Sequence, residues 1–255
     1  LGDSAKHAAY SLRPGEILLL ENLRFQPEEE ANDANFSSEL AKLGEVYVND
    51  AFSAAHRAHA STEGITHFLP AFAGRGMEAE LLALQEVLDF PARPVLAIIG
   101  GAKVSTKLTV LGNLLSRVQN LVIGGAMANT FLLAEGRQVG DSLVEPTMVE
   151  EAKSILKRAK SGGCIIHLPK DAIVASNHAL ESQVQAVDID KVPSGSRILD
   201  IGPETILQLQ ILMTRCPTLV WNGPLGLFEE EPFQRGTVAV AQRAGELTLK
   251  GRLKT

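Results

Sequence analysis

The stretch IIGGAK at residues 98–103 ends an apolar run in two glycines, and VIGGAM at residues 122–127 repeats the pattern. In both, a β-branched run that predicts a strand stops at paired glycines and gives way to a helix-like pattern. Glycine has no Cβ, so a ligand can approach its backbone closely, and the first N–H groups of the following helix can face an anion. Two such units in succession predict a crevice for phosphate or a nucleotide at the carboxyl ends of neighbouring parallel strands.

The composition excludes several classes of function. A length of 255 residues indicates one or two domains, and the net charge of -6 argues against a broad nucleic-acid-binding face. The apolar runs are short and broken by Gly or Pro, so we expect no membrane span. Cys164 and Cys216 stand in unrelated patterns, which favours a reducing, cytoplasmic environment over a disulfide framework. The chain begins at Leu1 without a secretory pattern, and we expect it to be part of a longer protein.

Strands and helices are predicted to alternate along the chain. Most predicted strands are continuously apolar, which favours a parallel sheet between two helix layers. Pro91 and Pro94 follow a predicted helix and mark a seam between a small first part and a larger α/β part. The predicted strands cover residues 16–20, 45–48, 95–99, 121–123, 164–167, 197–200 and 218–221, and the predicted helices cover 35–43, 78–88, 106–115, 127–135, 146–160, 204–215 and 237–246.

Two lysines stand where a helix ordinarily favours acids. Lys103 and Lys107 lie one turn apart at the start of the helix that follows the first glycine pair. Cations there oppose the helix dipole by about 0.3–1 kcal/mol. The alternative is a pair of solvated surface lysines. Because they are coupled to a glycine turn, we favour a bound polyphosphate that removes the repulsion.

Two arginines follow predicted strands in the first part of the chain. Arg24 comes after the strand at 16–20, and Arg57 lies in the polar loop after the strand at 45–48. Both are therefore expected at one edge of one sheet, where two guanidinium groups could clamp a small anion. His56 and His59 flank Arg57, and we favour packed or hydrogen-bonded roles for them over metal binding, since no third ligand shows local spacing.

Two later turns also carry polar groups. Gly202 begins a helix, which is either an ordinary helix start or a place where a flat ring can approach the backbone. Asn222 and Glu229 flank a Gly/Pro turn and could bond ribose hydroxyls, or simply belong to that turn. The run from Glu28 to Glu30 is interpreted as a solvated charge run.

Six motifs together resemble phosphoglycerate kinases. The resemblance implies reversible phosphoryl transfer in glycolysis between 1,3-bisphosphoglycerate and ADP, giving 3-phosphoglycerate and ATP. It further implies Mg²⁺ bound with the nucleotide, a cytoplasmic location, a monomer, and no nucleic-acid or membrane partner. The motifs are LLLENLRF (18–25), VNDAFSAAHRAHAS (48–61), IIGGAKVSTKL (98–108), IGGAMANTFL (123–132), DIGPET (200–205) and VWNGPLGLFE (220–229).

The resemblance also implies a fold and a set of site residues. The fold is α/β, with two Rossmann-like three-layer αβα domains that have parallel sheets and are joined by a hinge helix. Residues 1–76 would be the incomplete phosphoglycerate-binding domain, 77–90 the interdomain helix, and 91–255 the nucleotide-binding domain, truncated at its end. The implied roles are catalytic for Lys107 and Lys103, substrate-binding for Arg24 and Arg57, and nucleotide-binding for Gly100, Gly101, Lys103, Lys107, Gly124, Gly125, Gly202, Asn222 and Glu229, with no protein ligand to a metal.

The chain also departs from the family pattern. Such enzymes carry an earlier Asp-x-Asn loop, an earlier arginine at the transferring phosphoryl group, and a later Gly-Gly-Gly-Asp-Thr turn, all of which this sequence lacks. We therefore expect little or no turnover from these 255 residues alone. The alternative is a shortened, non-catalytic adenine-nucleotide-binding paralogue. A Rossmann dehydrogenase or a P-loop NTPase loses support, because neither Gly-x-Gly-x-x-Gly nor a Walker A motif occurs.

Overall fold

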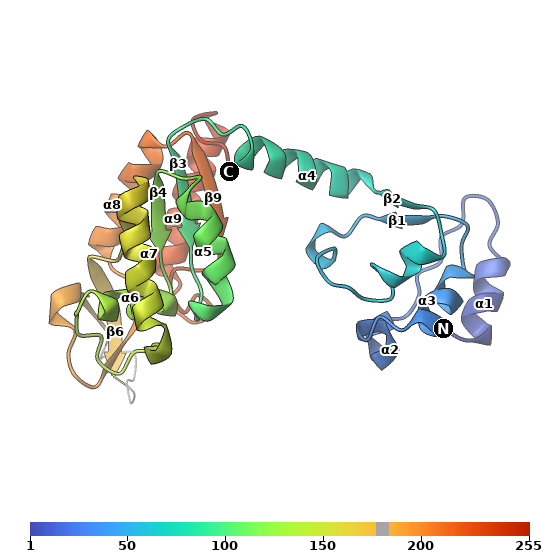
Figure 1. Ribbon diagram of the computed structural model, residues 1–255, viewed down its shortest axis with the longest axis horizontal. Helices are drawn as coiled ribbons and strands as arrows, with labels where there is room; N and C mark the ends of the chain where they lie inside the picture. The colour runs from blue at the N-terminus through green and yellow to red at the C-terminus, as the bar shows by residue number, and fades with distance from the viewer. Residues whose placement is uncertain (177–183) are drawn as a thin grey trace. The chain divides into compact units, whose positions relative to one another are not determined.

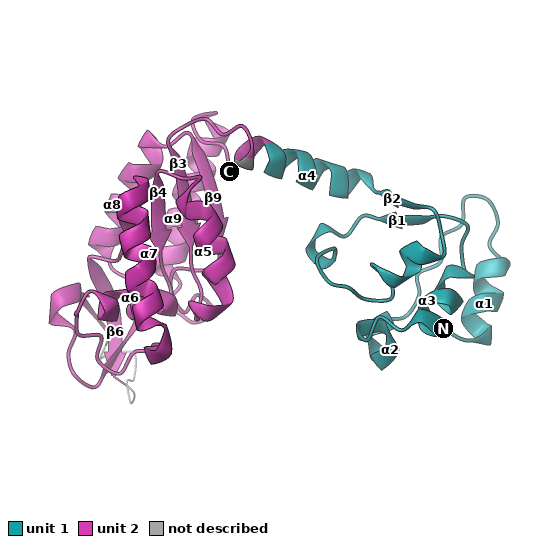
Figure 2. Ribbon diagram, viewed as in Figure 1, with its two compact units in different colours: residues 1–85 teal, residues 86–255 magenta. Residues whose placement is uncertain are grey.

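The computed structural model describes residues 1–176 and 184–255, with Leu88 described by its backbone alone. The chain divides into two compact units, unit 1 (residues 1–85) and unit 2 (residues 86–255), shown in different colours in Figure 2. The division falls inside helix α4 (Arg75–Leu88). The predicted α/β fold with a parallel, Rossmann-like sheet is confirmed.

Unit 2 is built on a four-stranded parallel sheet in the order β5-β4-β3-β9. All five residues of β3 (Val95–Ile99) are buried, because helices cover both faces of the sheet. Val95, Ala97 and Ile99 pack into one apolar cluster, whereas Leu96 and Ile98 pack into another on the opposite face. The other strands are β4 (Asn120–Ile123), β5 (Ile165–His167) and β9 (Thr218–Asn222).

The helices of unit 2 form the outer two layers (Figure 1). One cluster is completed by α5 (Leu108–Leu115), α6 (Ala126–Ala134) and α7 (Val149–Gly162). The other is completed by α8 (Pro203–Arg215) and α9 (Arg235–Leu249). This arrangement is the three-layer αβα architecture that the apolar strands predict.

A second, antiparallel sheet in unit 2 departs from the sequence prediction. Strand β6 (Asp171–Ser176) pairs with β7 (Gln185–Asp188) on one side and with β8 (Ser196–Ile201) on the other. The strand predicted at 197–200 therefore exists but lies outside the parallel sheet, and β6 and β7 were not predicted. Strand β7 is mostly exposed and has only two apolar residues in succession, whereas β6 contains the apolar run 172–175, which the sequence analysis did not assign to a strand.

Unit 1 has a small core around Leu40, Ala41 and Ile65. Its sheet consists of β1 (Tyr47–Asn49) and β2 (Ala71–Ala73), which pair in parallel. The α-helices that lie wholly in unit 1 are α1 (Asp3–Tyr10), α2 (Pro27–Glu30) and α3 (Ala34–Ala41). Its 3₁₀ turns are η1 (Leu23–Phe25), η2 (Phe52–Ala54) and η3 (Gly64–His67). The 3₁₀ turns described in unit 2 are η4 (Ser105–Lys107), η5 (Pro146–Met148) and η7 (Ile189–Lys191).

The strand predicted at residues 16–20 is wrong. The segment has no strand assignment, and Ile17 and Leu19 are 94% and 93% exposed. A strand needs a hydrogen-bonded neighbour, and in unit 1 this segment pairs with none. Across the described residues, no helix combines the length and apolar character needed to cross a membrane.

Candidate functional site

Three strands of the parallel sheet in unit 2 end at the same level. In the strand register, Ile99 of β3 lies opposite both Ile123 of β4 and Asn222 of β9. The next residue after each strand is a glycine, so a row of residues without side chains forms the carboxyl edge of the sheet. The row consists of Gly100, Gly124 and Gly223.

These glycines allow the strand-to-helix turns to pack against each other. A Cβ on Gly100 would lie 1.8 Å from the carbonyl oxygen of Pro224. Gly125 has a φ of +66°, and a Cβ there would lie 2.6 Å from the carbonyl oxygen of Gly101. Glycine is therefore required at these positions because the backbones of neighbouring turns contact each other there, whether or not a ligand is bound.

Lys107 and Asn222 meet at this edge. The Nζ of Lys107 donates a hydrogen bond to Oδ1 of Asn222, although 115 positions separate the two residues. A Cβ on Gly101 would lie 3.9 Å from Cε of Lys107, so the lysine side chain passes over the glycine turn. Three of the predicted residues, Gly101, Lys107 and Asn222, therefore come together, and the ammonium group of Lys107 lies at the end of β9.

Glu145, which the sequence analysis missed, binds the start of the helix that follows the first glycine pair, where we expected a phosphate to bind. Its carboxylate accepts hydrogen bonds from the Ser105 hydroxyl at 2.6 Å and the Ser105 N–H at 3.1 Å. Burial raises the pKa of Glu145, but hydrogen bonds from Ser105 and Val104 and the charge of Lys103 outweigh it, so its pKa lies below the ordinary value. At α6, the Met127 N–H donates to Gly101 O at 2.9 Å. The N–H groups of Ser105 and Met127, which lie where we expected donors to an anion, are therefore bonded by acceptors of the chain itself.

A cavity of about 290 Å³ lies beside the glycine edge and is called the nucleotide cavity below, after the role proposed for it. Gly101, Gly125 and Glu229 belong to its lining. The predicted residues outside its lining are Gly100, Lys103, Lys107, Gly124, Gly202 and Asn222. Of these, Lys107 passes over the lining residue Gly101 and donates its hydrogen bond to Asn222.

Gly202 lies against the carboxylate of Asp171. A Cβ there would lie 2.3 Å from Oδ2 of Asp171. The Asp171 carboxylate accepts the N–H groups of Glu204 and Thr205, both at 2.8 Å, and so caps the start of α8. The space beside Gly202 is therefore filled by the protein's own carboxylate. No local motif marks Asp171, because it lies more than thirty positions before the helix that it caps.

Asp200 is the one ionisable side chain of the nucleotide cavity that is almost fully buried, at 1% exposure. It accepts the N–H of Gly236 at 2.7 Å and that of Ile201 at 2.8 Å. Burial raises the pKa of Asp200 from 3.8 to about 6, against the lowering effect of these two hydrogen bonds. Asp200 thereby fastens the start of α9 to the wall of the cavity.

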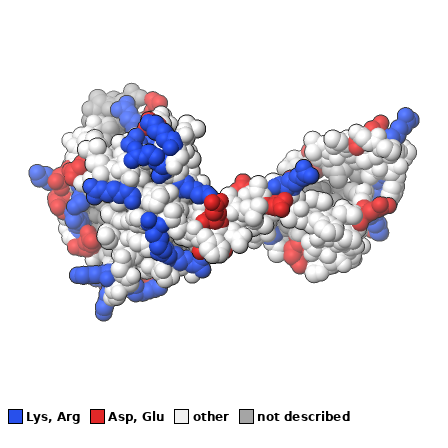
Figure 3. Space-filling view, turned by 90° about the horizontal axis from the view of Figure 1, so that it is seen from above, with Lys and Arg blue, Asp and Glu red and all other residues white. Residues whose placement is uncertain are grey.

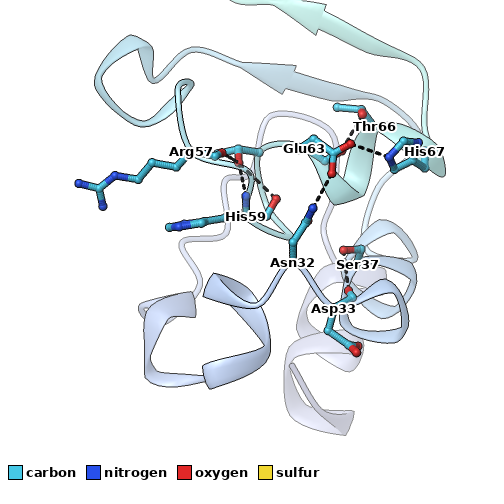
Figure 4. Close-up of polar contacts among 9 residues, drawn as sticks. Asn32, Asp33, Ser37, Arg57, His59, Glu63, Thr66 and His67 are labelled. Carbon is cyan, nitrogen blue, oxygen red and sulfur yellow. Dashed lines mark hydrogen bonds and ion pairs between the residues drawn. The ribbon is translucent and has the colours of Figure 1, made fainter. Parts of the chain in front are cut away.

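Unit 1 holds the two predicted arginines on exposed segments. Arg24 lies in η1, and Arg57 lies in the loop after η2. In Figure 4 the Arg57 side chain extends away from the hydrogen-bonded residues Asn32, Glu63 and His67. Since residues 16–20 form no strand, the expected placement of Arg24 at the end of a sheet strand is wrong.

A buried carboxylate nevertheless ties the two arginine segments together. Glu29 is 2% exposed, and its side chain accepts the Ser61 N–H at 2.9 Å and the Ser61 hydroxyl. Its backbone carbonyl accepts the Ala60 N–H at 2.9 Å. The interpretation of the glutamate run as solvated is therefore wrong for Glu29, which joins the helix after Arg24 to the loop after Arg57.

The two histidines of this loop differ in burial. His59 is half-buried, its backbone N–H donates to Oγ1 of Thr62 at 3.0 Å, and its ring Nδ1 is buried with no hydrogen-bond partner among the described residues. His56 is exposed. Over residues 1–176 and 184–255, no three His, Cys, Asp or Glu side chains gather in an arrangement that could hold a metal.

Comparisons with known proteins agree on one family. The family model described as phosphoglycerate kinase matches residues 1–252. Phosphoglycerate kinase of Roseiflexus sp. (strain RS-1) is 55% identical over 241 residues, which is 94% of this chain and 61% of the relative. That of Cereibacter sphaeroides (strain ATCC 17025 / ATH 2.4.3) is 53% identical over 253 residues, which is 99% of this chain and 64% of the relative. The chain thus spans less than two thirds of the length of these relatives.

Solved structures give the same result. The structure of phosphoglycerate kinase from Coxiella burnetii matches with a TM-score of 0.78 and 40% identity, covering 92% of this chain and 61% of that one. The crystal structure of phosphoglycerate kinase from Pyrococcus horikoshii OT3 matches with a TM-score of 0.81 and 30% identity, covering 95% and 63%. The resemblance carried by the six motifs is confirmed, and the chain belongs to the phosphoglycerate kinase family.

Proposed function

We propose that unit 2 binds the adenine nucleotide of a phosphoglycerate kinase, with Lys107 on its phosphates. The observation that carries this proposal is the meeting of Lys107 and Asn222 at the in-register glycine edge, next to a cavity that Gly101 and Gly125 line. A flat base fits in this cavity against the backbone of Gly101 and Gly125, and Glu229 offers an acceptor for ribose hydroxyls. Gly100 and Gly124 hold the turns in place, and Gly202 acts from outside the cavity by admitting the cap of α8.

Unit 1 is proposed to hold the three-carbon substrate, 3-phosphoglycerate or 1,3-bisphosphoglycerate. Arg24 and Arg57 are exposed guanidinium groups, and a guanidinium matches phosphate and carboxylate in a paired geometry. The bonds of Glu29 to Ser61 and Ala60 support a fixed spacing between the segments that carry them. The domain boundaries proposed for these roles are residues 1–76, 77–90 and 91–255.

The proposed reaction is reversible transfer of a phosphoryl group between the acyl phosphate of 1,3-bisphosphoglycerate and ADP, in glycolysis and in the cytoplasm. Such a transfer needs aligned reactants and fixed positive charge at the transferring group more than a protein nucleophile. Lys107 supplies that charge, and Lys103, close to Glu145, supplies a second cation near the helix start. Mg²⁺, which usually binds through substrate phosphates with few protein ligands, neutralises phosphate charge when it enters with the nucleotide. We propose a monomer that acts on these small molecules.

Calorimetric titration of the chain with MgADP tests the nucleotide site. We expect saturable binding, and we expect Lys107→Met to weaken it by about tenfold or more, because a charge-assisted hydrogen bond to phosphate is lost. Lys157→Met, which removes an exposed lysine of α7, is the matched control and should bind as the unmodified chain does. Equal affinity of the Lys107 and Lys157 variants would refute the assignment of Lys107.

A further inference from the structure

A second cavity in unit 2, of about 480 Å³, has no part in the proposed phosphoryl transfer. It lies between α8, the ends of β4 and β5, and the loop that leads from β5 to β6, and we call it the α8 cavity. Of the residues assigned to the nucleotide, only Gly124 touches it. Its volume falls in the range of cavities that enclose small organic molecules, which is about 300–1,000 Å³.

The inner wall of the α8 cavity is apolar. Val122 of β4 and Ile166 of β5 lie on the sheet side, and Leu209 and Leu212 lie on the α8 side. Val122 and Leu209 are almost completely buried, and Ile166 and Leu212 are half-buried. A wall of branched aliphatic side chains favours the apolar part of a ligand over inorganic ions or a sugar.

The polar lining of the α8 cavity carries an excess of positive charge. Among the described residues that line it, the cations are Arg137, Lys170 and Arg215, and the one carboxylate is that of Glu135. Arg137 is already paired, with Asp190 at 2.7 Å and with Glu135 at 3.3 Å. Among the residues that the structure describes, neither Lys170 nor Arg215 forms an ion pair.

This excess is local. Residues 86–255 hold 18 Lys and Arg against 17 Asp and Glu, so unit 2 as a whole is almost neutral and the negative net charge of the chain comes from unit 1. Lys and Arg side chains are spread over the face of unit 2 seen in Figure 3. The favourable position of Arg215 in the last turn of α8 accounts for one cation. It does not account for Lys170, which comes from the loop before β6 and lines the same cavity.

We propose that the α8 cavity binds a small organic anion, with an apolar ring or chain against the aliphatic wall and one phosphate or carboxylate group between Lys170 and Arg215. Two unpaired cations beside an enclosed apolar wall fit a molecule that carries both features. The site is separate from the nucleotide cavity, although Pro169, Ile201 and Leu225 contribute to the lining of both.

Phenyl phosphate is a probe with the required chemistry, and backbone amide NMR of the ¹⁵N-labelled chain reports where it binds. We expect saturable shifts at residues that line only the α8 cavity, such as His167 and Leu212, with a Kd below about 1 mM. Phenol, which lacks the anion, should shift the same amides at least about tenfold more weakly, because a charge-assisted hydrogen bond is absent.

Two variants test whether Lys170, Arg215 and the space of the α8 cavity hold the probe. Lys170→Gln with Arg215→Gln should weaken phenyl phosphate binding about tenfold or more, whereas Lys157→Gln with Arg158→Gln on α7 removes the same charge and should leave it unchanged. Gln208→Trp fills the mouth of the cavity with both cations retained, and it should abolish the shifts.

The proposal is overturned if shifts appear only at residues of the nucleotide cavity such as Gly101 and Glu229, or if none saturates. It is equally overturned if the Lys170 and Arg215 double variant binds as well as the unmodified chain. Calorimetry with MgADP on the same variants tests the nucleotide site separately. If the α8 cavity does not bind phenyl phosphate, the proposed binding of MgADP to the nucleotide cavity is unaffected.

Discussion

At the residue scale, Asp200 links the stability of unit 2 to pH. Its carboxylate is buried in the wall of the nucleotide cavity and holds the Gly236 N–H at the start of α9. Any Cβ on Gly226 or Gly236 would lie within 2.4 Å of its Oδ1, so the surrounding loops leave no room for it to reach water. Protonation removes the cost of a buried charge, and ionisation restores it.

We expect this group to destabilise unit 2 as the pH rises. The pKa of Asp200 is raised from 3.8 to about 6 in the folded state, so the folded state binds the proton more tightly than the unfolded state. The stabilising contribution of protonated Asp200 to the free energy of unfolding is fully present below pH 3.8 and is lost as the pH rises through about 6. The total loss is about 3 kcal/mol.

Urea unfolding at a series of pH values measures the effect. The difference between the unmodified chain and Asp200→Asn should change across this window, because the variant lacks the titrating group. Asp89→Asn, which removes an exposed carboxylate, should give a difference that stays flat with pH. If the difference in unfolding free energy between the unmodified chain and Asp200→Asn does not change with pH, Asp200 has the same pKa in the folded and unfolded states, which contradicts this account.

A second prediction at this scale concerns Glu29. Replacing it by Ala removes the acceptor of the half-buried Ser61 N–H, which costs about 1–3 kcal/mol, so the Ser61 amide should exchange with solvent at least about fivefold faster. Glu28→Ala, at an exposed neighbour, should leave that exchange unchanged. Hydrogen exchange followed by NMR gives both rates, and equal rates in the two variants would contradict the role of Glu29.

Residue types and spacing were enough to single out Lys107, Asn222 and the glycine turns. They were not enough for Glu29, Glu145, Asp171 or Asp200. Each of these carboxylates accepts a backbone N–H from a residue more than thirty positions away, which only the folded chain brings near. A run of three glutamates looks like a solvated surface until tertiary contacts bury one of its members.

At the scale of the elements, the turn after β4 depends on a backbone conformation that only glycine adopts freely. Gly125 combines a φ of +66° with a backbone contact to Gly101 that excludes a Cβ. We therefore expect Gly125→Ala to destabilise unit 2 by about 2 kcal/mol or more. Thermal and urea unfolding of the variant give the change.

Gly245 is the matched control for this substitution. It lies inside α9 with an ordinary helical φ, and a Cβ there would meet nothing within 4 Å. Gly245→Ala should stabilise unit 2 by about 0.5–1 kcal/mol, since alanine costs less conformational entropy in a helix. A loss of stability in the Gly245 variant, or none in the Gly125 variant, would contradict the roles assigned to these two glycines.

Apolar sequence predicted the elements only in part. The predicted bounds of β3 match the observed Val95–Ile99, because a strand buried on both faces is a continuous apolar run. Strand β7 was missed because it is mostly exposed and has only two apolar residues in succession, and β6 was missed although residues 172–175 are apolar. Residues 16–20 show the opposite error, since an apolar run alone does not make a strand without a neighbour to pair with.

At the scale of the molecule, binding and turnover should separate. The chain spans 61–64% of the relatives' length, and the sequence lacks the earlier arginine and the later Gly-Gly-Gly-Asp-Thr turn that the family resemblance implies for the phosphoryl group and the nucleotide phosphates. Each missing donor to developing charge costs about 2.7–4 kcal/mol of barrier. We therefore expect turnover reduced by at least about a hundredfold relative to a full-length family member.

A coupled assay with 3-phosphoglycerate and MgATP measures this difference. The full-length enzyme of Roseiflexus sp. (strain RS-1) serves as the reference, since it is 55% identical over the matched residues. Turnover from the 255-residue chain that approaches the reference would contradict the expectation and show that the residues described here suffice for transfer.

The central claim is that the glycine-walled edge of unit 2 is where the nucleotide lies, and a crystal structure of the chain with MgADP tests it most directly. We expect the base in the nucleotide cavity against the backbone of Gly101 and Gly125, the ribose within hydrogen-bonding distance of Glu229, and the phosphates in contact with Lys107. ADP bound elsewhere in unit 2, or seated in this cavity with its phosphates directed away from Lys107, would contradict the account.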